Sequence, residues 1–447
     1  MITSPAFAAK RYCILGLARS GLATLDALMA SGAECTVWDN REEARETAVS
    51  HHPQVRIGDP MEIDLKGFDG LIVSPGVPLN RHPVADRARA AGVPIIGDIE
   101  LFALARASLP PHRVVGITGT NGKSTTTALI HHIIREAGVP TIMGGNIGLP
   151  ILSQPPLPEG GIYVLELSSY QIDLTYSLDC DVAVLLNITP DHLDRYEGFA
   201  GYCAAKARLF AMQHDPEHVA VIATDDEPTR AIAATLTDPI EVHAADISAE
   251  DQHDWPSLQG PHNLQNAAVA VAIAEALGLT PMQWRPALAS FRGLPHRMER
   301  VADVNGVMFI NDSKATNPAS TAPALAAFQP VPRPRIHWIV GGLPKGDSLD
   351  ECAPHFDHVV HAYTIGEAGP VFADQLEKVM PVTRAELMAN AVRSAMANAK
   401  PGEVVLLSPA CASFDQFRDF EARGDCFRKI VDALIAEDAN HQEDAER

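Results

Sequence analysis

The sequence predicts an α/β protein with more than one domain. Apolar, β-branched runs alternate with helical stretches in three successive blocks, which is typical of parallel sheets covered by helices. A chain of 447 residues is too long for one ordinary core, and its length favours about three domains. A glycine-rich turn between a strand and a helix, Gly116–Thr125, opens the second block and predicts a phosphate-binding loop.

The composition, with 46% hydrophobic and 20% charged residues, is that of a globular protein. A formal net charge of −21 argues against a general affinity for nucleic acid or acidic lipid, so we expect neither as a partner. The seven cysteines form no C-x-x-C pair, which favours the reducing cytoplasm. No signal peptide is visible at the N-terminus, and no apolar run approaches the ~20 residues of a membrane helix.

The first block predicts strands over Tyr12–Leu15, Glu34–Trp38 and Leu71–Val73, with a helix over Leu22–Ser31. The turn after the first strand resembles a dinucleotide fingerprint, but Ala18 occupies its middle glycine position. Asp39 ends the second strand, near the place where an acidic group meets a ribose. Two interpretations stay open for this turn, a packing turn and a nucleotide diphosphate site.

The later blocks repeat the alternation of strands and helices. In the second, we expect a helix to begin at Thr126, a polar loop over 246–259, and a helix over Asn263–Leu277. In the third, we expect a helix over Arg384–Asn398 and a proline-rich loop at Gln329–Pro334. The predicted strands of the two blocks lie near Tyr163–Leu167, Val182–Leu186, Val219–Ile222, Val307–Ile310, Ile336–Val340, Val359–Ile365 and Val404–Leu407.

The phosphate-binding loop combines three sources of positive potential. Backbone N–H groups of the turn and the N-terminus of the following helix favour an anion. Lys123 adds a full charge for the outer phosphates, and the Ser124 hydroxyl is suited to Mg²⁺. The usual P-loop spacing is incomplete, because Ile117 stands where the first glycine belongs and Gly119 forms a tighter loop.

Three further residues follow strands of the same block. Glu166 ends a strand beside the loop and is well placed to hold Mg²⁺. His192 follows the next strand. Lys206 has small apolar neighbours, which favour a neutral and therefore reactive amine, although a surface position is equally compatible with the sequence.

The third block has two polar clusters at strand ends. Asp312 directly follows a strand, and Arg297, Lys314 and Thr316 lie near it in the sequence. Ser413 follows another strand and could bind a carboxylate together with nearby N–H groups.

Taken together, these motifs resemble the Mur ligase family, in order from about Ile14 to about Phe427. The phosphate loop and HNLQN at His262–Asn266 belong to the wider family, whereas NDSKATN and SPACASFDQF are more specific. The motifs that carry the resemblance are GTNGKST at Gly119–Thr125, GGNIG at Gly144–Gly148, LELSSYQ at Leu165–Gln171, DHLDRY at Asp191–Tyr196, HNLQN, GLPHR at Gly293–Arg297, NDSKATN at Asn311–Asn317 and SPACASFDQF at Ser408–Phe417.

The resemblance implies a Rossmann-like UDP-substrate domain over residues 1–100, a central P-loop ATPase-type domain with a parallel sheet over 101–295, and a Rossmann-like amino-acid domain over 296–447. It implies an ATP-dependent ligase of peptidoglycan precursor synthesis that joins D-glutamate to UDP-N-acetylmuramoyl-L-alanine through an acyl phosphate. It also implies ATP and two Mg²⁺ ions, with Lys206 carbamylated. We expect a monomer whose partners are these small molecules.

The resemblance assigns roles residue by residue. Lys123, Glu166, His192 and Lys206 are the catalytic set, and Ser124, Glu166, His192 and Lys206 are the metal ligands. ATP contacts fall on Gly119, Thr120, Asn121, Gly122, Lys123, Ser124, Thr125, Asn263, Asn266, Arg297 and Asp312. The residues expected to bind the UDP substrate are Leu17, Ala18, Asp39, Asn40, Arg41 and Asn146. The residues expected to form the D-glutamate pocket are Lys314, Thr316, Lys345, Ser413 and Phe420.

Four alternatives stay open. A sister Mur ligase or a folylpolyglutamate-type ligase would keep the phosphate loop, and a ligase adding L-glutamate would differ only in pocket geometry. A nicotinamide-dependent oxidoreductase would use the Gly16 turn but would leave Lys123, Glu166 and His192 without a role. A regulator that binds nucleotide without catalysis would form no amide.

Overall fold

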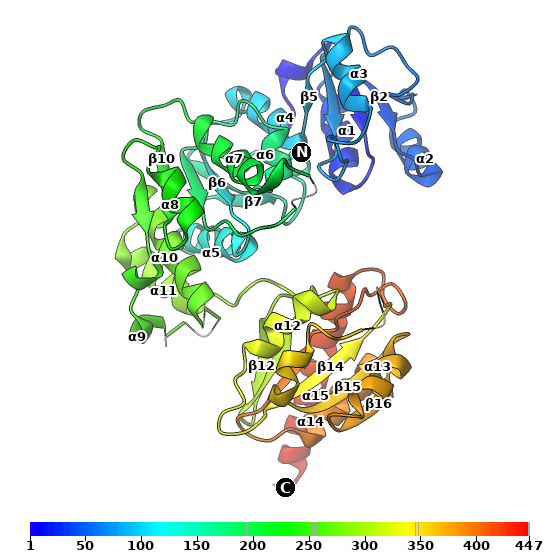
Figure 1. The fold of residues 1–447 in the computed structure, drawn as a ribbon, viewed down its shortest axis with the longest axis vertical. Helices are drawn as coiled ribbons and strands as arrows, with labels where there is room; N and C mark the ends of the chain where they lie inside the picture. The colour runs from blue at the N-terminus through cyan, green and yellow to red at the C-terminus, as the bar shows by residue number, and fades with distance from the viewer. Residues whose placement is uncertain are drawn as a thin grey trace. The chain divides into compact units, whose positions relative to one another are not determined.

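The computed structural model describes residues 1–192, 195–252, 254–255, 257–258, 260–344, 346 and 348–445. The chain divides into two compact units, Met1–Phe291 and Arg292–Arg447. The first unit contains two sheets, coloured blue to green in Figure 1, and the second contains one, coloured yellow to red. The α/β architecture with three sheets confirms the fold class predicted from the sequence.

The first sheet is parallel throughout and has the strand order β3-β2-β1-β4-β5. The three strands expected here are present. The first helix begins at Arg19, three residues earlier than predicted, because Ala18 supplies the extended N-cap residue. The elements are β1 (Arg11–Leu15), α1 (Arg19–Ala30), β2 (Glu34–Trp38), α2 (Glu42–His51), β3 (Arg56–Ile57), β4 (Gly70–Val73), α3 (Val84–Ala91) and β5 (Ile95–Ile96).

The second sheet is also parallel, in the order β11-β10-β9-β6-β8-β7. Its helix α5 begins at Lys123 rather than Thr126, so the lysine of the phosphate loop is already the first helical residue. A short helix, α9, interrupts the segment expected to be a loop. The elements are α4 (Asp98–Ala105), β6 (His112–Thr118), α5 (Lys123–Glu136), β7 (Thr141–Gly145), β8 (Gly161–Glu166), α6 (Ser169–Asp173), β9 (Val182–Leu185), α7 (Gly198–Ala211), β10 (Val219–Ala223), α8 (Glu227–Ala233), β11 (Ile240–Val242), α9 (Ala249–Gln252), α10 (Pro261–Ala276) and α11 (Pro281–Ser290).

The third sheet has the order β12-β13-β17-β14-β15-β16, and only the β12–β13 pair is antiparallel. The prediction of a helix from Arg384 was wrong at its start. Val382–Glu386 is the edge strand β16, with only Ala385 buried, so it lacks the apolar run that identified the central strands. The elements are β12 (Glu299–Val304), β13 (Val307–Asn311), α12 (Pro318–Ala326), β14 (Ile336–Gly341), β15 (Val359–Ile365), α13 (Gly369–Leu376), β16 (Val382–Glu386), α14 (Met388–Asn398), β17 (Val404–Leu407) and α15 (Phe420–Ala445).

Burial on both faces explains why the central strands are mainly apolar. In β14, Trp338 packs in the core that contains Phe372, whereas its neighbour Ile339 packs on the opposite face with Phe427. Each such side chain contributes about 2–3 kcal/mol when fully buried. None of the described helices is both long enough and apolar enough to span a bilayer.

The two sheets of the first unit share one core. Phe102 of α4 lies in the same hydrophobic cluster as Ile14 of β1 and Tyr163 of β8, and its ring meets that of Tyr163 at 5.0 Å. In the second sheet, β6 lies between β9 and β8. The loops that leave the carboxyl ends of these three strands therefore meet at one edge, where ligands bind in open α/β sheets.

Candidate active site

The phosphate-binding loop between β6 and α5 depends on two glycines with positive φ. Gly119 has φ +153°, and a Cβ there would lie 2.9 Å from the Cβ of Leu186. Gly122 has φ +80°, and a Cβ would lie 2.3 Å from Oδ1 of Asn266. Any side chain would therefore both strain the backbone and displace a neighbouring side chain. The backbone reaches its neighbours this closely only because both positions are glycine.

Two lysines converge on one carbonyl group of this loop. Lys123 Nζ donates to Gly119 O at 3.0 Å and to Thr120 O at 2.7 Å. Lys206 Nζ, from α7, donates to the same Gly119 O at 2.7 Å. Lys206 is 1% exposed, and burial, with Lys123 as the second cause, lowers its pKa to about 7. The surface position that the sequence left open for Lys206 is excluded.

Glu166 ends β8 beside the loop and is 2% exposed. Its Oε1 accepts a hydrogen bond from Asn146 Nδ2 at 3.0 Å, and Oε2 is buried with no hydrogen-bond partner in the structure. Directly after it, Ser168 and Gln171 form a capping box that starts α6 and fixes the end of the strand. A buried carboxylate oxygen without a partner is costly, and it is what a cation ligand would satisfy.

Asn187, which was not among the predicted site residues, fixes the other side of the loop. It follows β9, and its backbone oxygen accepts from Thr120 N at 2.9 Å while its Oδ1 accepts from Asn121 N at 2.8 Å. Tyr202 is a second such residue: its hydroxyl lies 3.3 Å from Thr120 Oγ1 and Lys206 Nζ lies 4.7 Å from its ring centre. The position of Asn187 at a strand end was the available sequence signal.

His192 lies on the exposed side of this region, with φ +52° and Nε2 3.5 Å from Asp191 Oδ2. The ring centre of His192 is 4.9 Å from that of Tyr170. The guanidinium of Arg195 lies 4.2 Å from the centre of the same Tyr170 ring. The structure therefore assembles an aromatic and cationic group here that residue spacing did not predict. Asp194 and Leu193 lie outside the described residues.

The remaining predicted ATP-contacting residues of the first unit cluster at the start of α5 and α10. Ser124 and Thr125 are half-buried in the first turn of α5. Asn266 is 4% exposed and accepts from Thr126 Oγ1 at 3.2 Å and donates to Asn263 Oδ1 at 3.1 Å. Asn266 thus links α10 to the beginning of α5, directly after the phosphate loop.

The loop after β1 is held by Asp39. One carboxylate oxygen accepts from Leu17 N at 2.8 Å and the other from Arg41 N at 2.9 Å. Partial burial alone would raise the pKa of Asp39, but these bonds and the Arg41 side chain outweigh it and hold the pKa below its usual value. Ala18 and Asn40 are exposed beside it. Asp39 therefore organises this loop, whatever ligand the loop receives.

In the second unit, the predicted residues surround the ends of β13 and β17. Asp312 is 5% exposed and accepts from Ser408 Oγ at 2.7 Å and from Met298 N at 3.1 Å. Burial raises its pKa to about 7. Lys314 lies with Nζ 4.2 Å from the ring centre of Phe420. Arg297 is exposed, Thr316 is half-buried and Ser413 is buried, while Lys345 lies outside the described residues.

Arg423 links these loops and was missed by the sequence analysis. It is 1% exposed and donates to Ser313 Oγ at 3.0 Å, Ser313 O at 2.9 Å and Ala412 O at 3.0 Å. Burial lowers its pKa to about 10. Nothing in the residues around position 423 of α15 indicates this role, because its partners are about 11 and 110 positions away.

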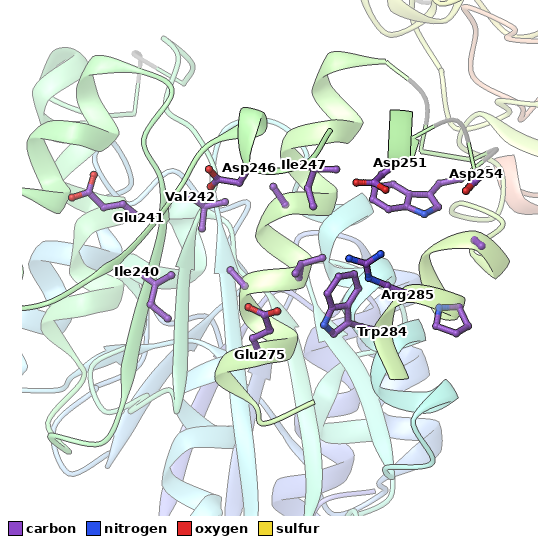
Figure 2. Close-up of a pocket in the computed structure, with 16 residues that line it drawn as sticks. Ile240, Glu241, Val242, Asp246, Ile247, Asp251, Asp254, Glu275, Trp284 and Arg285 are labelled. Carbon is purple, nitrogen blue, oxygen red and sulfur yellow. The ribbon is translucent and has the colours of Figure 1, made fainter. Parts of the chain in front are cut away.

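A cavity of about 680 Å³ lies between β11, α10 and α11 and contains none of the predicted site residues (Figure 2). Five carboxylates, among them Asp246 and Glu275, line it together with Trp284 and Arg285. An excess of negative charge disfavours a triphosphate. Size alone therefore does not identify the nucleotide site in this molecule.

Comparison with known sequences identifies the class of protein. Three family models match consecutive parts of the chain: the Mur ligase MurD-like N-terminal domain at residues 10–97, the Mur ligase middle domain at 117–274, and the Mur ligase glutamate ligase domain at 296–411. The chain belongs to the Mur ligase family, whose members are ATP-dependent ligases.

Individual relatives within the family are much more similar to this chain than the family models alone indicate. The UDP-N-acetylmuramoylalanine–D-glutamate ligase of Novosphingobium aromaticivorans is 70% identical over 439 residues, covering 97% of each chain. The enzyme of the same name from Sphingopyxis alaskensis is 61% identical over 437 residues, covering 98% of this chain and all of the relative. The chain is thus similar over nearly its whole length to two enzymes that carry the same name.

Solved structures share the fold. The UDP-N-acetylmuramate–alanine ligase of Thermotoga maritima superposes with a TM-score of 0.57 at 18% identity, covering 95% of this chain and 99% of that one. The UDP-N-acetylmuramoylalanyl-D-glutamyl-2,6-diaminopimelate–D-alanyl-D-alanyl ligase of Acinetobacter baumannii gives 0.56 at 18%, covering 96% and 92%. At this identity the likeness shows the shared fold alone.

Proposed function

We propose that this protein joins D-glutamate to UDP-N-acetylmuramoyl-L-alanine, with cleavage of ATP to ADP and phosphate, in peptidoglycan precursor synthesis. The observation that carries the choice of substrates is the 70% identity, across nearly the whole chain, to a ligase with this name. The phosphate loop supports the ATP-dependent half of the reaction. Two lysines donate to one of its carbonyl groups, and a buried carboxylate oxygen of Glu166 beside it has no hydrogen-bond partner.

In the proposed first step, the carboxylate of the UDP substrate attacks the γ-phosphorus of ATP. A new O–P bond forms, the bond to ADP breaks, and an acyl phosphate results. Lys123 and the loop N–H groups oppose the charge on the transferring phosphoryl group. In the second step, the amine of D-glutamate attacks the acyl carbon, phosphate leaves, and the amine loses a proton as the amide forms.

The residues beside the loop fit Mg²⁺. We propose Ser124, Glu166, His192 and Lys206 as ligands for two ions, which would neutralise phosphate charge when bound. The unpartnered Oε2 of Glu166 supports this, because a hard cation prefers carboxylate oxygen. Among the described residues no three His, Cys, Asp or Glu side chains cluster as a metal site, so such ions would also need phosphate or water oxygens.

We propose that Lys206 acts as a carbamate. An ammonium cannot ligate a cation, but addition of CO₂ to the neutral amine gives an anionic oxygen donor and releases a proton. The lowered pKa of Lys206 provides that neutral amine near pH 7. The carbamate nitrogen keeps one hydrogen, which could preserve the bond to Gly119 O.

The other substrates are assigned by domain. We propose a UDP-substrate site in residues 1–100 with Leu17, Ala18, Asp39, Asn40 and Arg41, joined by Asn146, and an ATP site in residues 101–295. We propose that residues 296–447 bind D-glutamate through Lys314, Thr316, Lys345, Ser413 and Phe420, and ATP through Arg297 and Asp312. A cytoplasmic location follows from these substrates, and we propose a monomer.

One assay tests the function. Purified protein is given ATP, Mg²⁺ and UDP-N-acetylmuramoyl-L-alanine with D-glutamate, L-glutamate, L-lysine or meso-diaminopimelate, and phosphate and amide product are measured. We expect both only with D-glutamate, and neither with Lys123→Ala. Equal or greater turnover with L-glutamate would mean that the pocket selects the other stereoisomer. ATP binding without amide in any mixture would contradict the proposal.

A second experiment addresses the carbamate. Lys206→Ala should lose activity and regain part of it when acetate or another short carboxylic acid is added, because the acid can replace the carbamate oxygens. The matched control Lys123→Ala should gain nothing from the acid. Full activity of Lys206→Ala without any acid would exclude a metal-ligating role for Lys206.

A further inference from the structure

Arg195 spans two parts of the first unit that the proposed reaction must bring together. It follows the loop that carries His192 in the central domain, yet its guanidinium contacts the loop after β4 in the N-terminal domain. Nη2 donates to Val77 O at 3.0 Å and to Pro75 O at 3.4 Å, and Nη1 donates to Gly76 O at 3.4 Å. Three consecutive carbonyl groups therefore share one side chain.

The contacted loop adjoins the turn proposed to hold the UDP substrate. Ser74 N donates to Leu15 O at 3.1 Å, and Ser74 Oγ donates to Gly16 O at 3.3 Å. The strand ends of β1 and β4 are thus tied together at the carboxyl edge of the first sheet, where ligands bind in such folds. A Cβ at Gly76 would meet no atom within 4 Å, so one side of this loop is open.

The guanidinium of Arg195 also contacts the central domain, close to the proposed metal ligand His192. Its guanidinium lies 4.2 Å over the ring of Tyr170, and that ring lies 4.9 Å from the ring of His192. Tyr170 belongs to α6, which starts three residues after Glu166. One planar cation thus connects the loop of the UDP domain with Tyr170, whose ring lies beside the proposed metal ligand His192. A rigid fork suits this task better than a flexible ammonium.

We propose that Arg195 is a positioning residue, which holds the loop of residues 75–77 against the catalytic edge so that the bound UDP substrate presents its carboxylate to the phosphate loop. This inference rests on the proposed function. A misplacement of about 1 Å in such an arrangement can cost about a hundredfold in rate.

Arg208 supplies a matched control. It also donates to backbone carbonyls, those of Thr175 at 2.9 Å and Asp173 at 3.4 Å, and it also lies over a tyrosine ring, that of Tyr176 at 5.4 Å. All these partners belong to the central domain. Arg208→Ala therefore removes a comparable set of contacts without releasing the loop of the UDP domain.

The test measures kcat, KM for UDP-N-acetylmuramoyl-L-alanine, and the ATP dissociation constant for wild type, Arg195→Ala, Arg195→Lys and Arg208→Ala. For Arg195→Ala we expect KM for the UDP substrate to rise at least tenfold and kcat to fall at least tenfold, with ATP affinity within twofold of wild type. Arg195→Lys should recover little, since one ammonium cannot span three carbonyls. Arg208→Ala should change these constants less than threefold.

Hydrogen exchange of residues 74–79 gives a readout that does not depend on turnover. We expect faster exchange in Arg195→Ala than in wild type or Arg208→Ala, and protection by added uridine diphosphate to weaken. Unchanged exchange together with an unchanged KM would overturn the positioning role, as would full rescue by lysine. If the wild type forms no amide at all, the proposed function fails, whereas the exchange result still decides whether Arg195 holds the loop.

Discussion

The phosphate loop of the first unit and the loops after β13 and β17 of the second unit occupy the same kind of position but satisfy their polar groups differently. Around the phosphate loop, two lysines donate to Gly119 O, and Glu166 keeps a buried oxygen without a partner. In the second unit, both oxygens of Asp312 accept hydrogen bonds, and Arg423 donates three.

This difference suggests that the phosphate loop is a binding site that a ligand completes, whereas the buried groups after β13 and β17 form a scaffold that holds its loops in place. Unsatisfied or crowded charge costs stability and persists where function requires it. Satisfied buried polar groups fix the geometry of the loops around them. We therefore expect substitutions near the phosphate loop to impair activity without loss of stability, and substitutions of the buried groups in the second unit to lower stability first.

The largest expected effect is that of Glu166→Gln on turnover. The amide keeps the shape and can still accept from Asn146, but it loses the anionic oxygen proposed for Mg²⁺, so kcat should fall by about 10²–10³-fold. The melting temperature should stay the same or rise, because a buried charge is removed. Assays over a range of Mg²⁺ concentrations, with circular dichroism melting, measure both. A large loss of stability would show that Glu166 is structural.

Arg423→Met should have the next largest effect, on the stability of the second unit. It leaves Ser313 O and Ala412 O without their donor in a buried region, at a cost of about 3 kcal/mol in the free energy of unfolding. Urea unfolding followed by a probe in the second unit measures it. An unchanged midpoint would contradict the scaffold role, and the exposed Arg418→Met is the control.

Lys206→Met tests the surroundings of the phosphate loop through the pH dependence of stability. The pKa of Lys206 is lower in the folded than in the unfolded protein, so its burial penalty is complete below pH 7 and declines as pH rises toward 10.5. Methionine should therefore stabilise the protein by about 2 kcal/mol at pH 6, and by less at pH 9, while activity is lost. A stability difference that does not depend on pH would exclude a buried, proton-binding amine.

The smallest effect concerns Asp312→Asn. Burial raises the pKa of Asp312 to about 7, so the wild type should lose stability from this group as pH rises from about 4 to 7. Asparagine can still accept from Met298 N and can donate to Ser408 Oγ, and it does not ionise. We expect the variant to be about 1 kcal/mol more stable relative to wild type at pH 8 than at pH 4, as measured by urea unfolding. A constant difference would contradict this assignment.

Much of the fold was predictable from local pattern. The strands β2 and β15 match their predicted bounds, because most of their residues are buried and most are apolar. The edge strand β16 was taken for helix, because an edge strand with polar side chains lacks that pattern. Helix α5 begins at Lys123 because Gly122, in the left-handed region, supplies its N-cap.

The candidate site was predictable only in part. Lys123 and Glu166 follow from a glycine turn and a strand end, which are local features. The burial of Lys206, the brace from Asn187 and the contacts of Arg195 with residues 75–77 depend on which strands and loops become neighbours. Pairs about 66 to 120 positions apart leave no mark in a single sequence.

The order of residues determined that the chain forms parallel sheets with a glycine loop suited to phosphate, because strand hydrophobicity and turn geometry are set by neighbours along the chain. Tertiary structure alone decided which groups carry unusual charge states and which arginines join distant loops. Burial and proximity are properties of packed elements, and those properties arise only when β6 lies between β8 and β9 and when the loops at their ends meet.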